Sequence, residues 1–209
     1  MKKLLYLFVF LITILILLVS LKMIAFNTGF YEKEFIKLGI YEKFGNESIQ
    51  DNVNKLVNYL NDKGSLEAGF FNEREIAHLS DVKILVNKAE IAFYLLAITV
   101  VLFFVYMFMK KEHGMLGKII IYSGILSLFL ILLLLLIVSL NFEGFFTTFH
   151  LLSFNNYLWL LNPETDNLIA LFPEKFFYDA TLMVMYIAAF ISLASIAFGL
   201  ILLKFSRKH

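Results

Sequence analysis

Histidine is the residue type in this chain whose unperturbed pKa best suits acid–base chemistry near neutral pH. The 209 residues include no cysteine, which excludes thiol nucleophiles, disulfides and cysteine-metal sites. Ser153 lacks the glycine elbow of a serine hydrolase nucleophile, which argues against that class. Two of the four histidines, His78 and His150, stand in unusual local motifs. Since imidazole has an unperturbed pKa of about 6.5, either could serve as a base near neutral pH.

The first motif, Phe71–Lys83 (FNEREIAHLSDVK), has the pattern of an amphipathic helix. On such a helix Arg74, His78 and Asp81 share one face, because they lie four and three residues apart. The functional interpretation is a histidine whose tautomer is held by Asp81, with Arg74 facing an oxyanion or a carbonyl. The alternative, which spacing alone favours, is a solvated helix face with an ion pair worth less than about 1 kcal/mol.

The second motif is the aromatic-rich stretch 141–179, which holds His150 and the only tryptophan, Trp159. Its eleven aromatic residues exceed what anchoring at a membrane interface needs, although an interfacial belt is the ordinary explanation for any one of them. Together they could line a dry pocket for acyl chains. We expect further orienting or substrate-binding roles for two rings and for three polar side chains, and the polar ones need hydrogen-bond partners if they are buried: Phe149, Trp159, Asn155, Asn156 and Asp166.

Neither a metal nor a cofactor is expected from the motifs. His78, Asp81, His150 and Asp166 could ligate zinc, but no spacing typical of a zinc site supports this, and there is no glycine-rich phosphate loop. The formal net charge of +1 gives no strong basic field, so we expect no nucleic-acid partner.

The elements that must position these residues are membrane helices. The chain is 60% hydrophobic with a mean hydropathy of +0.80, and crossing a bilayer takes about 20 apolar residues. The sequence predicts an all-α membrane protein with four transmembrane helices and a small helical extracellular cap. The expected order is transmembrane helix 1–26, cap with an interfacial helix 27–90, transmembrane helix 91–109, cytoplasmic loop 110–118, transmembrane helix 119–140, extracellular aromatic-rich segment 141–180, transmembrane helix 181–204 and cytoplasmic tail 205–209.

Local signals mark where two of these elements begin. Asn72 and Glu75 have the spacing of a capping box, so a helix should start directly after Asn72. A straight helix over 73–109 would be about 55 Å long, which overshoots the bilayer. We therefore expect residues 73 to about 87 to lie on the membrane and bend into the span. Pro163 marks a turn and a candidate first position of a further helix.

Charge distribution predicts the orientation. The N-terminus, the 110–118 loop and the C-terminus together carry eight basic residues and one acid, so they belong in the cytoplasm. Both long polar segments then face outside. The apolar runs within the four spans, 4–21, 91–109, 119–140 and 181–203, contain no Asp, Glu, Lys, Arg or His, which argues against a pump or coupled transporter and directs function to the outer surface.

The two motifs, FNEREIAHLSDVK and FTTFHLLSFNNYLWLLNPETDNLIALFPEKFF, resemble the signatures of the lipoprotein intramolecular transacylases, a family of bacterial integral membrane proteins. The resemblance covers essentially the whole chain. It implies that His78 and His150 are catalytic and that the substrate is a diacylated lipoprotein of the bacterial cell membrane. The family reaction moves the sn-2 acyl chain from glycerol to the cysteine α-amino group. The chain departs from the pattern at Ser153, Tyr157 and Asn162, where we expect phenylalanine, an acid and aspartate.

The chemistry that this implies suits two histidines. His150 is assigned as the base and His78 as acid or oxyanion partner, with the roles open to exchange. Because amine and ester belong to one molecule, orientation alone can supply up to about 7–11 kcal/mol. Two other functions stay open: a non-catalytic lipid-binding or assembly protein anchored in membrane lipid, and an outer-surface lipid acyl hydrolase. The sequence leaves the oligomeric state undetermined.

Overall fold

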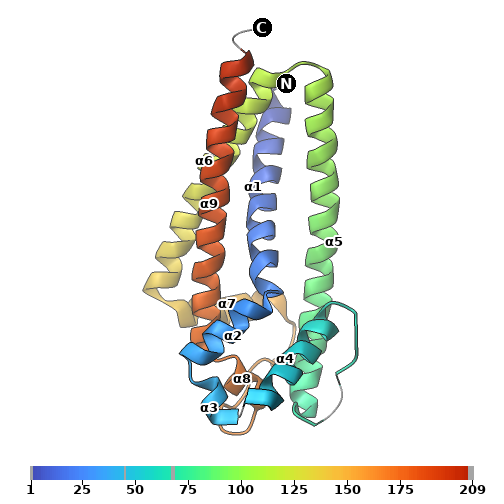
Figure 1. Cartoon of the computed structure of the whole chain (residues 1–209), viewed down its shortest axis with the longest axis vertical. Coiled ribbons are helices and arrows are strands. Elements are labelled where there is room, and N and C mark those ends of the chain that lie inside the picture. Colours follow the sequence, from blue (N-terminus) through green and yellow to red (C-terminus); the bar gives the residue numbers. More distant parts are fainter. Residues whose placement is uncertain (1, 45, 67–68, 207–209) are drawn as a thin grey trace. The chain divides into compact units, whose positions relative to one another are not determined.

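The computed structural model describes residues 2–44, 46–66 and 69–206, and these residues form helices and connecting turns without any strand (Figure 1). The predicted all-α class is confirmed. The predicted tail 205–209 lies mostly outside the described residues. The helices are α1 (Lys2–Ala25), α2 (Thr28–Lys37), α3 (Ile40–Phe44), α4 (Asn46–Leu60), α5 (Glu73–Met109), α6 (His113–Leu140), α7 (Phe142–Ser153), α8 (Asn167–Leu171) and α9 (Glu174–Ser206).

The chain divides into two compact units. The span unit comprises Met1–Met23, Glu90–Ser139 and Leu182–His209, and the site unit comprises Ile24–Ala89 and Leu140–Thr181. Both histidine motifs fall inside the site unit.

The span unit contains the apolar parts of α1, α5, α6 and α9, which are long and apolar enough to cross a membrane. This agrees with the four predicted spans. Helices α6 and α9 approach closely at glycine: a Cβ on Gly117 would lie 2.8 Å from the carbonyl oxygen of Gly199. Such contact between small residues is typical of helix packing in lipid. Thr13 of α1 donates a hydrogen bond of 3.2 Å to the carbonyl oxygen of Ser123 in α6.

Helix α5 begins with the predicted capping box. The backbone N–H of Asn72 donates to Glu75 Oε2 at 2.6 Å, and the N–H of Glu75 donates to Asn72 Oδ1 at 3.0 Å. Because neither glycine nor proline follows, the helix runs without interruption from Glu73 to Met109. The predicted interfacial piece and second span are therefore one helix. The position of residues 73–87 on the membrane surface stays a prediction.

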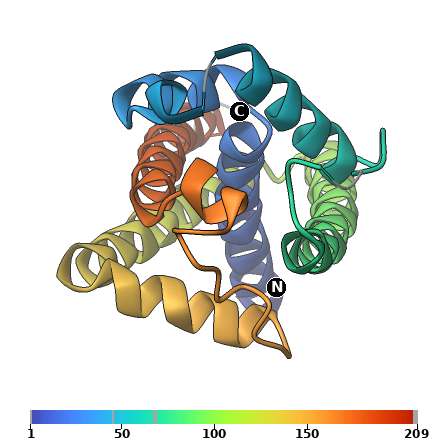
Figure 2. The same cartoon turned by 90° about the horizontal axis from the view of Figure 1, so that it is seen from below.

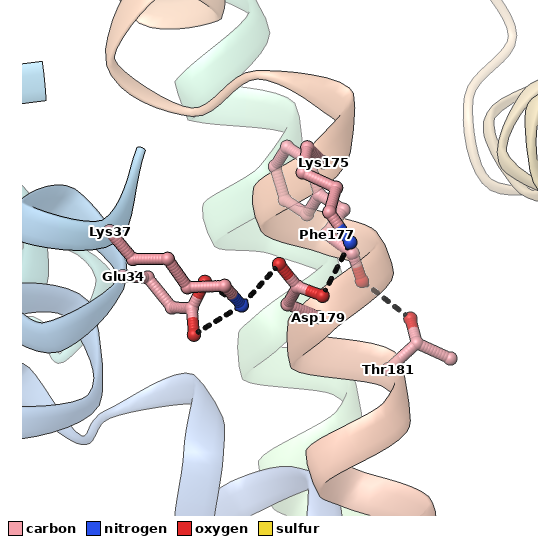
Figure 3. Close-up of polar contacts among 6 residues, drawn as sticks. All are labelled: Glu34, Lys37, Lys175, Phe177, Asp179 and Thr181. Carbon is pink, nitrogen blue, oxygen red and sulfur yellow. Dashed lines mark hydrogen bonds and ion pairs between the residues drawn. The ribbon is translucent and has the colours of Figure 1, made fainter. Parts of the chain in front are cut away.

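Aromatic packing and ion pairs hold α2 against the start of α9 within the site unit. Phe35 is fully buried and its ring lies 5.9 Å from that of Phe176 in the first turn of α9. Beside this contact, Asp179 accepts hydrogen bonds of 2.8 Å from both Lys37 and Lys175 (Figure 3). Burial raises the pKa of Asp179, but the two ammonium groups outweigh it and hold that pKa below its usual value.

The segment between α7 and α8 contains the predicted turn at Pro163. The chain reverses direction after α7 and runs on to α8 (Figure 2). The prediction that a helix starts at Pro163 was wrong, because the next helix, α8, begins only at Asn167. The physical reason is that Asp166 Oδ2 accepts a 2.7 Å hydrogen bond from the N–H of Asn162, which closes the turn on itself.

Candidate active site

The structure brings the two candidate histidines together. His78 lies in the second turn of α5 and His150 near the end of α7, and their ring centroids are 6.2 Å apart. Both are buried, with 6% and 8% of their surfaces exposed. Residues 72 positions apart in the sequence thus share one interior.

Aromatic rings enclose this pair. His150 has four rings within contact distance, and Phe154 also packs edge-on against His78 at 5.1 Å. The ring neighbours of His150 and their centroid distances are Phe146 at 4.2 Å, Trp159 at 4.9 Å, Phe149 at 5.4 Å and Phe154 at 5.7 Å. An apolar wall of this kind favours neutral imidazoles over charged ones.

The hydrogen bond of His150 sets its tautomer. Its Nδ1 lies 2.8 Å from the carbonyl oxygen of Phe146, one turn earlier on α7. A carbonyl oxygen only accepts, so Nδ1 carries the proton and Nε2 keeps its lone pair. Burial lowers the pKa of His150, although the bond to Phe146 works in the other direction. Near neutral pH this side chain is therefore an uncharged base.

His78 differs from His150 because its Nδ1 is buried without a hydrogen-bond partner among the described residues. The pKa of His78 is lowered to about 4, mainly by burial and also by the nearby His150, while Asp81 opposes the shift. An unsatisfied buried nitrogen costs about 1–3 kcal/mol, so each one needs an explanation. A substrate group that bonds to this atom would remove the cost.

Of the two interpretations of the first motif, the one in which Asp81 holds the tautomer of His78 has no hydrogen bond behind it among the described residues. Asp81 Oδ2 instead accepts a 2.8 Å hydrogen bond from Asn156 Nδ2, a residue of the segment after α7. Asn156 also braces its own segment: its Oδ1 accepts from the N–H of Leu158, and its carbonyl oxygen accepts from Trp159 Nε1 at 3.0 Å. Asn156 thus fixes Trp159, which covers His150, to the helix that carries His78.

Arg74 and Asn155 do not line the histidine pair as expected. Arg74 is exposed, and its Nη2 donates to the carbonyl oxygen of Tyr157 at 2.9 Å, so it braces the same segment from outside. Asn155 is exposed and makes no hydrogen bond to the described part of the chain. Asp166 is buried within the turn before α8, where it accepts from Asn72 Nδ2 at 2.9 Å.

Known proteins resemble this chain in sequence and in fold. The family model described as lipoprotein intramolecular transacylase Lit matches residues 6–177. The chain belongs to the lipoprotein intramolecular transacylase family. The structure of the membrane integral lipoprotein intramolecular transacylase Lit from Bacillus cereus matches with a TM-score of 0.86 at 23% identity, covering 100% of both chains. A structure of the same protein with one histidine replaced by arginine matches at 0.80 and 24%, covering 100% of this chain and 94% of the other.

These solved structures share the fold of the present chain, which is a multi-pass membrane protein. A protein of Aquifex aeolicus (strain VF5), named only as uncharacterized, is 32% identical over 133 residues. That match covers 64% of this chain and 55% of the relative, so the chain spans about half the length of that relative.

Glu75 is a positioning residue that sequence reasoning recognised only as a helix cap. Its side chain is 1% exposed, and its second oxygen, Oε1, accepts a hydrogen bond from the N–H of Leu168 in α8. Close by, Asn167 Nδ2 donates to the carbonyl oxygen of Phe70 at 2.6 Å. The start of α5 and the start of α8 are thereby joined. The capping-box spacing was the only sequence signal, and it does not report a partner 93 residues away.

No group of three His, Asp or Glu side chains gathers at metal-binding distance within the described residues. A shallow surface depression lined by Phe142, Glu174, Lys175 and Tyr178 lies at the other end of α7. It contains no histidine.

Proposed function

We propose that this protein is a lipoprotein intramolecular transacylase that acts on the diacylglyceryl-modified N-terminal cysteine of a lipoprotein. It moves the sn-2 acyl chain from glycerol to the cysteine α-amino group and so produces lyso-form lipoprotein. The observation that carries this proposal is the buried pair, His78 and His150, 6.2 Å apart within an aromatic wall. Family membership supports the same reaction class.

The reaction conserves protons, which suits two histidines that begin neutral. The amine nitrogen forms a bond to the ester carbonyl carbon, the bond from that carbon to the glycerol oxygen breaks, and one proton passes from nitrogen to oxygen. Free α-amino groups have a pKa of about 7.7–8.0, so a base must keep the attacking amine uncharged. His150 can accept that proton on Nε2, because Phe146 occupies Nδ1.

His78 would then act on the oxygen atoms of the ester, either the carbonyl oxygen that becomes an oxyanion or the departing glycerol oxygen. With a pKa of about 4 it is uncharged at neutral pH, so it offers a hydrogen bond and not a resting positive charge. Its unpartnered Nδ1 can donate to the oxyanion or to the departing glycerol oxygen. Without substrate, the buried nitrogen lacks a hydrogen bond. If it gains one only when the oxyanion forms, that hydrogen bond stabilises the transition state more than the ground state.

The apolar wall supports transfer to the amine over hydrolysis. Phe146, Phe154 and Trp159 surround the base and exclude water, whereas the amine arrives attached to the same substrate molecule as the ester. A lipid acyl hydrolase would need a water beside His150 Nε2. We therefore propose acyl transfer, with histidine as the only acid–base residue type and without a covalent acyl-enzyme.

The distribution of charge supports the placement of the site. We propose a bacterial cell-membrane protein with both termini in the cytoplasm and the histidine pair at the extracellular face, because basic residues gather at the termini and at the 110–118 loop. Membrane lipid surrounds the spans, and diacylated lipoprotein is the partner that reaches the site.

Mass spectrometry of lipoproteins from cells with and without the protein tests this function. The expected result is an acyl chain on the cysteine amine and one chain on glycerol, only when the protein is present. Unchanged diacyl-form lipoprotein would instead support a lipid-binding or assembly protein. Loss of an acyl chain as free fatty acid, without N-acyl product, would identify a hydrolase.

A further inference from the structure

Helix α7 carries a second apolar stripe that does not face the histidine pair. Phe145, Phe149 and Leu152 follow one another at spacings of four and three, so they share one side of the helix. Leu152 is 84% exposed and Phe149 is half-exposed. The neighbouring stripe, which includes Phe146 and His150, faces the interior of the site unit. The two stripes meet where the Phe149 ring packs edge-on against His150 at 5.4 Å.

The exposed stripe continues into the segment after α7. Tyr157 and Leu160 are both more than half exposed. From Gly144 to Pro163 the sequence contains no Asp, Glu, Lys or Arg. Exposed apolar surface of this extent marks a place where something other than water covers the protein. A stretch of twenty residues that is partly exposed and carries no Asp, Glu, Lys or Arg is unusual for a surface that faces water.

Chain connectivity identifies the covering partner. The apolar run of α6 ends at Leu140, and α7 begins at Phe142, with only Asn141 between the two helices. Consecutive Cα atoms are about 3.8 Å apart, so the first turn of α7 starts beside the point where a span leaves the bilayer. An amphipathic helix at that level places its apolar side among lipid acyl chains.

We propose that the Phe145–Phe149–Leu152 stripe of α7 lies in the acyl-chain region of the adjacent lipid leaflet and borders a lateral path from the bilayer to His150. Phe149 stands at the boundary, with one side toward lipid and its edge toward the base. An acyl chain could then reach the histidine pair without crossing water. The insertion does not depend on the reaction, whereas the path rests on the proposed function.

The single tryptophan allows a direct test of insertion. Trp159→Phe combined with Leu152→Trp gives a chain whose only indole is on the stripe. The matched control combines Trp159→Phe with Ile36→Trp, because Ile36 is 66% exposed but sits on α2 among Glu32, Lys33 and Lys37. In phosphatidylcholine vesicles with brominated acyl chains, the Leu152→Trp protein should lose at least half of its fluorescence and the control less than a fifth. Equal quenching of both, or none at Leu152→Trp, would overturn the proposal.

A second measurement separates lipid from a second copy of the chain. If Leu152→Trp were shielded from bromine and from aqueous iodide, and chemical crosslinking in vesicles gave dimers, a protein interface would occupy the stripe and the proposal would be wrong. For the path, Leu152→Asp should slow turnover of a diacylated lipopeptide in vesicles at least tenfold. Its turnover of a short-chain analogue in detergent should stay within threefold of the wild type. Equal loss in both assays would refute the path while leaving the reaction itself intact.

Discussion

Asn156→Asp is the substitution that best isolates the brace between the two walls of the site. The side chain keeps its shape but loses the N–H₂ group that donates to Asp81 Oδ2 at 2.8 Å. A hydrogen bond to a charged acceptor is worth about 1.5–3 kcal/mol, and the new carboxylate also repels the existing one. Loss of this hydrogen bond alone should lower the ratio of protein with the segment after α7 held against α5 to protein with it released by about 10- to 150-fold.

The expected consequence is a loss of turnover of at least tenfold at pH 7. Trp159 donates to the carbonyl oxygen of Asn156 and covers His150, so release of this segment opens the base to water. The assay is conversion of a diacylated lipopeptide by protein in detergent, followed by mass spectrometry. The ratio of variant to wild-type rate should rise as the pH falls toward 5, because protonation of the new carboxylate restores a donor.

The matched control is Asn155→Asp, the same change at the preceding residue, which is exposed and makes no hydrogen bond to the described residues. Its turnover should stay within twofold of the wild type. The reasoning is refuted if both variants lose activity equally, or if Asn156→Asp keeps more than half of the wild-type rate.

Three further outcomes follow from buried groups elsewhere. Glu75→Gln should lower the free energy of unfolding by about 1–3 kcal/mol, because an amide N–H₂ replaces one of the two oxygens that accept backbone N–H groups. The control is Glu73→Gln, an exposed residue of the same turn, which should have little effect in thermal unfolding. Unfolded histidine binds a proton near pH 6.5 but His78 only near pH 4, so thermal stability should fall as the pH drops through that window, and His78→Asn should flatten the dependence. Gly117→Ala should cost about 1–3 kcal/mol in detergent, because its new methyl group would lie 2.8 Å from the Gly199 carbonyl oxygen; an unchanged melting temperature would contradict the close approach.

Sequence patterns were sufficient for features that are set locally. Four uncharged runs predicted four membrane helices, since length and apolarity alone decide whether a helix can span a bilayer. The capping box at Asn72 and Glu75 involves residues three apart, and the structure has both of its hydrogen bonds. Both histidine motifs were also identified from residue types, although their closeness could be inferred only from the family resemblance and the topology.

Partner choice across the site could not be predicted in this way. Asp81 lies three residues from His78, yet it bonds to Asn156, 75 residues away, because the path of the segment after α7 determines which donor arrives. Asn155 and Asn156 are adjacent residues of the same type. The path of the backbone points the Asn156 side chain at Asp81 and leaves the Asn155 side chain exposed, and residue type alone does not predict which is which. Pro163 favours a helix start, but the carboxylate of Asp166 closes a turn there instead. The partner of Asp81 is thus set by a contact distant in sequence, whereas the turn at Pro163 is set by a side-chain contact between residues four apart that competes with the helix start.

The most direct test of the central claim uses purified protein and one defined diacylated lipopeptide whose sn-2 chain carries an isotope label. The account predicts that the wild type moves the label to the cysteine amine without free fatty acid. His78→Ala and His150→Ala should each remove at least 99% of that product while keeping the wild-type melting temperature within a few degrees. Near wild-type transfer by either variant, or label recovered as free fatty acid from the wild type, would contradict acyl transfer by a histidine pair.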